Sequence, residues 1–182
     1  FPPVLHLQLK RFEYDFNYDQ LIKINDRYEF PESIDLSPYL DPEISSSNAD
    51  SYIYDLHGVL VHTGDISTGH YYTMIKPSIE DQWYRFDDDK VWRVTKNQVF
   101  EENFGHVRLP DEKLRTFTRE QYQNYLISRQ TSAYMLVYVR KDMEDKILQE
   151  VEDSDVPQHI VTSIENEKQE SEKRRKELEE MH

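Results

Sequence analysis

The 182-residue sequence contains no cysteine and only four glycines. Without cysteine, the chain cannot form a disulfide, bind zinc through thiolates or supply a thiol nucleophile. It also has no run of about 18 apolar residues, the length that a membrane-spanning helix needs. These absences exclude a disulfide-stapled scaffold, and no membrane partner is predicted.

Basic residues are scarce as well. Lysine and arginine number 22 against 36 aspartates and glutamates, which gives a net charge of −14. Because nucleic-acid binding needs clustered basic side chains, no nucleic-acid partner is predicted. The negative charge instead suits a basic protein partner that is attracted by electrostatic steering.

Apolar residues make up 37% of the sequence, and their distribution is uneven. Aromatic and β-branched residues dominate up to about residue 141, whereas the remainder is almost all charged residues and helix formers. We therefore predict a folded domain over residues 1–141 and a charged helical extension over residues 142–182. Within the extension, a helix is predicted over residues 143–151, and four charge pairs at i,i+4 spacing are predicted further on: Glu170 with Arg174, Glu172 with Lys176, Lys173 with Glu177 and Arg175 with Glu179.

Period-two and continuous apolar patterns predict that the domain is rich in strands. The expected strands are residues 4–12, 21–25, 52–62, 70–75, 82–86, 91–94 and 132–140. The last is apolar almost throughout, which is typical of a central strand buried on both faces. Helices are predicted from Thr95, as N-cap, to residue 100 and again over 119–127. Residues 31–51, rich in proline and serine, are predicted to be a surface excursion. The fold class is α+β.

The stretch from Val59 to Asp89 places a histidine and three aspartates on one predicted hairpin. If the hairpin is centred near Ile79, the residue opposite His70 is about Asp88, and Asp87 is one place away. Opposed residues have Cβ atoms roughly 4.5–5.5 Å apart, so a carboxylate should reach the imidazole. A carboxylate on one ring nitrogen, with the other free for a nucleophile, is half of a hydrolytic triad.

The competing interpretation of these residues is structural. His70 is one of seven histidines, and residues 87–89 could form a solvated turn. His62 and Asp65 are a second conceivable site, but their spacing to His70 fits no catalytic or metal motif. A structural role is therefore favoured for His62. No metal or cofactor is predicted.

Three separate sequence boxes favour the catalytic interpretation. They are Gly69-His70-Tyr71 with Trp83-Tyr84 and Phe86-Asp87-Asp88, the opening run PPVLHLQLKRF from Pro2 to Phe12, and AYMLVY at residues 133–138. In this order they resemble the ubiquitin-specific proteases over about residues 1–140. Within that family, the resemblance is closest to the herpesvirus-associated branch and its fungal counterparts.

The resemblance implies a papain-like cysteine protease fold, of which this chain is mainly the antiparallel β-sheet palm. It implies a deubiquitinase that hydrolyses the isopeptide bond at the C-terminal glycine of ubiquitin. His70 would be the general base and Asp87 the residue that orients it, with Asp88 a further catalytic candidate. The nucleophilic cysteine and an oxyanion-hole asparagine would come from an upstream half of the catalytic domain, so this chain alone should be inactive.

By the same resemblance, six residues line the channel for the ubiquitin tail: Arg11, Phe12, Tyr14, Lys23, Tyr71 and Tyr134. Core packing is the competing role for each aromatic residue among them, and it is favoured more for Phe12 and Tyr134 than for Tyr71. The implied partners are ubiquitin, ubiquitinated proteins, the upstream half of the domain and further C-terminal domains, in the cytoplasm or the nucleus. A non-catalytic ubiquitin-binding module and a β-rich interaction scaffold are the alternative functions.

Overall fold

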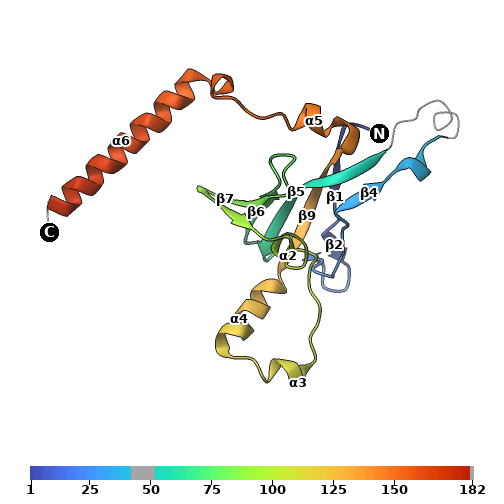
Figure 1. The fold of residues 1–182 in the computed structure, drawn as a ribbon. Coiled ribbons are helices and arrows are strands. Elements are labelled where there is room, and N and C mark those ends of the chain that lie inside the picture. Colours follow the sequence, from blue (N-terminus) through green and yellow to red (C-terminus); the bar gives the residue numbers. More distant parts are fainter. Residues whose placement is uncertain (42–51, 181–182) are drawn as a thin grey trace. The chain divides into compact units, whose positions relative to one another are not determined.

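A computed structural model describes residues 1–41 and 52–180 of the chain (Figure 1). The chain divides into two compact units, Phe1–Leu148 and Gln149–His182. The first unit holds the strands and the second a long helix. Residues 142–148 of the predicted extension therefore lie in the first unit. In the described ranges, no helix combines the length and apolar character needed to cross a membrane.

Seven strands of the described residues form one sheet, and each of its pairings is antiparallel, as predicted. The strand order is β1 (Val4–Gln8), β9 (Thr131–Arg140), β5 (Ile53–Gly64), β6 (Gly69–Ile75), β7 (Trp83–Asp87) and β8 (Lys90–Val94). A short strand, β4 (Ser33–Asp35), also pairs with β5. The strands β2 (Phe12–Asp15) and β3 (Gln20–Lys23) form a separate ribbon.

The predicted central position of the apolar strand is confirmed. β9 lies between β1 and β5, and none of its ten residues is exposed. Its neighbour β5 is the longest strand and carries two register irregularities against β9, between Leu56 and Gly58 and between Leu60 and Val61. β9 and β5 join the two halves of the sheet, because β9 pairs with β1 and β5 pairs with β6. The pairing of β5 with β6 also positions the hairpin that follows.

The single strand predicted over residues 4–12 is wrong, because the chain divides there into β1 and β2. Arg11 turns inward between them and is 4% exposed. Its guanidinium donates to the backbone carbonyls of Ala133, Asp26 and Phe104, at 3.1, 2.7 and 3.4 Å. A strand that continued through this point would remove the Arg11 donor from those buried carbonyls, of which only that of Phe104 is also shown to accept from a backbone amide, that of Tyr28, among the described residues.

The helices of the first unit are short. They are η1 (Ser37–Tyr39), α2 (Lys96–Phe100), α3 (Asp111–Leu114), α4 (Arg119–Ser128), η2 (Lys141–Met143) and α5 (Glu144–Ile147). Thr95 caps α2 as predicted, in a capping box with Gln98. The predicted α4 is present, and Thr118 and Gln121 form its capping box. The second unit holds η3 (Asp153–Asp155) and α6 (Gln158–Glu180).

A helix predicted over residues 143–151 is wrong in length, since α5 ends at Ile147. Glu150, Glu152 and Asp153 follow at what would be its C-terminal end. Carboxylates are unfavourable there because they face the negative end of the helix dipole. The predicted excursion over residues 31–51 contains β4 and η1, and its residues 42–51 lie outside the described part.

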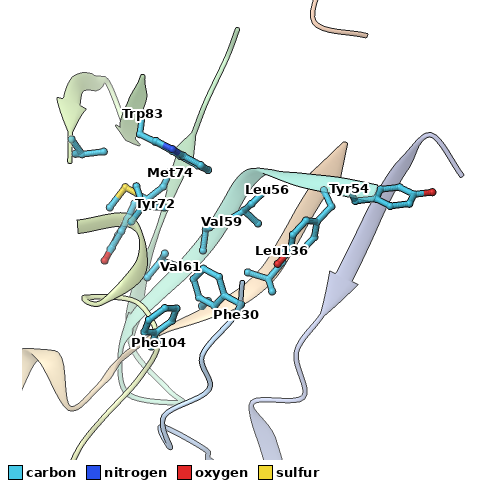
Figure 2. Packing of buried hydrophobic residues seen from close by; sticks show 14 of the residues in the cluster. Phe30, Tyr54, Leu56, Val59, Val61, Tyr72, Met74, Trp83, Phe104 and Leu136 are labelled. Carbon is cyan, nitrogen blue, oxygen red and sulfur yellow. The ribbon is translucent and has the colours of Figure 1, made fainter. Parts of the chain in front are cut away.

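The core fills one layer against the sheet. Figure 2 shows Leu56, Val59, Met74 and other side chains gathered there, with Trp83 at one end and Phe104 at the other. α2 and the turn after it contribute Val99, which is fully buried, and two phenylalanine rings. Burying such side chains stabilises a fold by about 1.5–3 kcal/mol each. The β6–β7 hairpin is thus fixed on a packed base.

Candidate active site

The β6–β7 hairpin brings His70 and the aspartates to one end of the sheet. Its register pairs Thr73 with Phe86, one residue away from the register predicted for a hairpin centred at Ile79. The shift arises in the long connection between the strands, residues 76–82, whose composition fixes a turn but not its register. His70 and Asp87 both lie beyond this last pair, at the open end of the ladder.

The imidazole of His70 and the carboxylate of Asp87 are in direct contact. The distance from His70 Nε2 to Asp87 Oδ1 is 2.5 Å. This bond raises the pKa of His70 and, together with Arg85, lowers the pKa of Asp87. The contact does not use the second ring nitrogen, Nδ1, and the His70 side chain is 44% exposed. The pair can therefore present a carboxylate-oriented imidazole to a reacting group.

A third residue, Arg85, joins this pair and was not predicted. Its Nε and Nη2 atoms lie 3.0 and 2.5 Å from Asp87 Oδ2. The guanidinium carbon lies 3.6 Å from the ring centre of Tyr72 and 5.2 Å from that of Trp92. The sequence could have indicated this contact, because Arg85 and Asp87 are two residues apart on one strand and therefore share a face of the sheet.

Asp88 occupies the turn rather than a strand. Asp87 pairs with Lys90, so Asp88 and Asp89 form a two-residue hairpin loop. Asp88 has a φ of 53°, a left-handed conformation that aspartate tolerates better than most residues. Its charge adds to that of Asp87 in raising the pKa of His70. Its predicted catalytic role remains a prediction.

These three side chains are also close enough to share a cation. Among the described residues, His70, Asp87 and Asp88 each offer a ligand atom within 4.8 Å of the others. Exposed acidic groups commonly stand this close without a metal. The contact between His70 and Asp87 accounts for the proximity of two of the three.

Four of the six predicted channel residues line one hollow of about 630 Å³: Arg11, Phe12, Tyr71 and Tyr134. The rings of Phe12 and Tyr71 lie 5.4 and 5.8 Å from the ring of Tyr134, both edge-on. Tyr134 is 8% exposed, and its hydroxyl has no hydrogen-bond partner among the described residues.

The other two predicted channel residues do not line this hollow, although Lys23 Nζ lies 5.5 Å from the centre of the Tyr134 ring. Tyr14 is exposed and hydrogen-bonds to Asp19 within the ribbon. Lys23 borders a different hollow, together with Gly64, Asp65 and Gln130. Its Nζ lies 2.8 and 2.5 Å from the carbonyls of Gly64 and Gln130, and burial lowers its pKa to about 8.

His62 packs against two aromatic rings and a lysine, and the structural role favoured for it at the end of a strand remains a prediction. Its ring lies 4.6 Å from that of Tyr71 and 4.9 Å from that of Tyr134, and its Nδ1 is 2.9 Å from Lys23 Nζ. On its other side it borders Gly69, where an added Cβ would lie 2.1 Å from His62 Nε2. His62 thus links the aromatic hollow to the residue that precedes His70.

Comparisons with known proteins decide the family. A model described as ubiquitin carboxyl-terminal hydrolase matches residues 1–138, and a Saccharomyces cerevisiae relative, ubiquitin carboxyl-terminal hydrolase 15, is 64% identical over the whole chain. The chain belongs to the ubiquitin carboxyl-terminal hydrolase family. This confirms the resemblance inferred from the three sequence boxes. Membership of this family also fits the papain-like fold that the resemblance implied.

Other family members match over almost the same range. Ubiquitin carboxyl-terminal hydrolase 5 of Schizosaccharomyces pombe is 44% identical over 100% of this chain, and ubiquitin C-terminal hydrolase 13 of Arabidopsis thaliana is 42% identical over 97%. A solved structure of the yeast SAGA DUBm with mutant Sgf73 has a TM-score of 0.50 at 28% identity, covering 77% of this chain and 24% of that one. The chain spans only 15–16% of the three sequence relatives.

Proposed function

We propose that the protein to which this chain belongs is a cysteine-type deubiquitinase. It hydrolyses the isopeptide bond at the C-terminal glycine of ubiquitin, and this chain supplies the base, its orienting carboxylate and part of the tail channel. The observation that carries the proposal is the 2.5 Å contact between His70 Nε2 and Asp87 Oδ1, in a chain of this family. The thiol comes from outside this chain, which has no cysteine.

In this mechanism His70 Nδ1 accepts the proton of the thiol as sulfur attacks the carbonyl carbon of the terminal glycine. The imidazolium returns the proton to the lysine amine, which leaves as the C–N bond breaks and a thioester remains. Water then attacks the thioester carbon as His70 takes its proton, and the C–S bond breaks. This releases the ubiquitin carboxylate and a thiolate that recovers the proton from the imidazolium. Asp87 fixes the proton on Nε2 and stabilises the imidazolium, as its effect on the pKa of His70 indicates.

The substrate assignment draws on the aromatic hollow and on the charge of the chain. The hollow is bordered by Arg11, Phe12, Tyr71 and Tyr134, and its aromatic rings suit an extended peptide. The net charge of −14 favours a basic partner. Asp88, Tyr14 and Lys23 keep their predicted roles in the site as parts of this proposal. The upstream half of the domain, further C-terminal domains and a cytoplasmic or nuclear location also belong to it.

The test compares two histidine variants of the full-length protein. His70→Ala should abolish release of a fluorophore from the ubiquitin C-terminus while leaving the Kd for ubiquitin within about twofold, because only the base is lost. His159→Ala, an exposed change in α6, is the matched control and should keep the wild-type rate. Normal turnover by His70→Ala would contradict the role. A wild-type protein that binds ubiquitin without hydrolysis would instead be the non-catalytic module.

A further inference from the structure

We propose that Arg85 is a positioning residue for the reaction, holding one carboxylate oxygen of Asp87 so that the other meets His70. This inference rests on the proposed function. It comes from the geometry of the carboxylate, whose two oxygens have different partners. Oδ1 contacts His70 Nε2 at 2.5 Å, and Oδ2 contacts Arg85 Nε at 3.0 Å and Nη2 at 2.5 Å.

Two donors from one planar guanidinium restrict the carboxylate more than a single donor would. Rotation about the bond to the carboxylate carbon would move Oδ2 away from both nitrogens and Oδ1 away from His70. Without Arg85, the Asp87 side chain keeps, among the described residues, only its contact to a half-exposed imidazole. Charge-assisted hydrogen bonds such as these are shorter and roughly twice as strong as hydrogen bonds between neutral groups.

The guanidinium is itself held by packed residues. It lies 3.6 Å from the ring centre of Tyr72, which is buried, and its side chain is 26% exposed. The hydroxyl of Tyr72 donates to Asn103 Oδ1 at 3.1 Å, and Asn103 is fully buried. Arginine stacked on an aromatic face keeps its in-plane donors available for a carboxylate.

Asn103 ties this arrangement to α2. Its side-chain nitrogen donates to the carbonyls of Gln98 and Val99, at 2.8 and 2.9 Å. A continuous series of contacts thus runs from α2 through Asn103, Tyr72 and Arg85 to Asp87. The core of the domain therefore sets the orientation of an imidazole that lies at the open end of the hairpin.

The test is a double-mutant cycle in the full-length protein, with kcat and KM measured on a ubiquitin C-terminal fluorophore. Arg85→Gln should lower kcat by about tenfold to a hundredfold with KM within about twofold, because misplaced catalytic groups slow the chemical step. In an Asp87→Ala background, adding Arg85→Gln should change kcat by less than about twofold, because the residue acts through Asp87. Arg93→Gln, on the adjacent strand β8, is the matched control and should keep the wild-type kcat.

Arg85→Lys distinguishes positioning from charge and guards against a variant that fails to fold. It keeps the positive charge but not the two-donor fork, so its kcat should lie between those of wild type and Arg85→Gln. Wild-type kcat in both variants, or an equal loss from Arg85→Gln in either background, would overturn the inference and leave the proposed function standing. An inactive wild-type protein would remove the proposed function and this inference with it.

Discussion

At the scale of single residues, the chemistry depends on which aspartate meets the imidazole. Asp87 contacts His70, whereas Asp88 is held in a turn with positive φ and acts on His70 through its charge. In the proposed mechanism, the general base is therefore oriented by the residue at the end of β7. Asp87 contacts His70 because it is the last residue of the strand, whereas Asp88 and Asp89 lie in the turn that follows.

We expect Asp87→Asn to lower kcat by about two to four orders of magnitude, since the amide neither fixes the proton on Nε2 nor stabilises the imidazolium. The pKa of His70, which the Asp87 bond raises, should fall in the same variant. Ubiquitin-fluorophore kinetics and an NMR titration of the ring measure the two effects. Asp89→Asn is the control, and an unchanged kcat in Asp87→Asn would shift the orienting role to Asp88.

Gly69 is required by its neighbours rather than by its backbone angles. A Cβ there would lie 2.1 Å from His62 Nε2 and 2.8 Å from the Thr63 carbonyl, and His62 is held by Lys23 and two rings. Gly69→Ala should therefore displace the adjacent His70 and lower kcat by about a hundredfold. Gly58→Ala, whose nearest neighbour is Val137 Cβ at 3.6 Å, should retain activity in the same assay. Equal kcat values for the two variants would show that the residues around Gly69 can move to accommodate the added Cβ without displacing His70.

The sequence predicted the contact between the imidazole and a carboxylate because a strand–turn–strand pattern limits which residues can meet. It did not predict Arg85, since the hairpin shows which face Arg85 shares with Asp87 but not that Tyr72 will support the guanidinium. Nor did it show that Arg11 would turn inward to three carbonyls. Both outcomes depend on tertiary contacts between distant segments.

At the scale of elements, patterns that local physics decides were predicted well. The continuous apolar run of β9 and the N-cap threonine of α2 needed no tertiary information. β4 was missed because three residues carry too little periodicity, and it forms through pairing with β5. The hairpin register was wrong by one residue because a seven-residue connection does not define it.

The two capping boxes allow a matched comparison. Thr95 caps α2, which contributes the fully buried Val99, whereas Thr118 caps α4, which has no buried residue. Each Thr→Ala change should cost its helix about 1 kcal/mol. Urea unfolding should show that loss for Thr95→Ala, while Thr118→Ala should mainly speed amide exchange within α4. An equal fall in global stability would mean that α4 is part of the core.

At the scale of the whole molecule, the uneven distribution of apolar residues corresponds to two units. The first contains the core, and α6 in the second keeps Ile160, Ile164 and Leu178 exposed. Of four charge pairs predicted along α6 at i,i+4 spacing, Arg175 and Glu179 lie 3.7 Å apart, and no other of them is within 4 Å among the described residues. Exposed pairs of this kind add little to stability.

Removal of residues 149–182 should accordingly leave the urea midpoint of the remaining unit unchanged. The removed segment includes the 23 residues of α6 and contributes no buried hydrophobic side chain among the described residues. Its removal should therefore not reduce the hydrophobic contribution to the free energy of unfolding. Far-UV circular dichroism should fall by the signal of one long helix at the same time. A lower midpoint, with the same loss of helical signal, would show that the helix stabilises the sheet, and the boundary would then have to be redrawn.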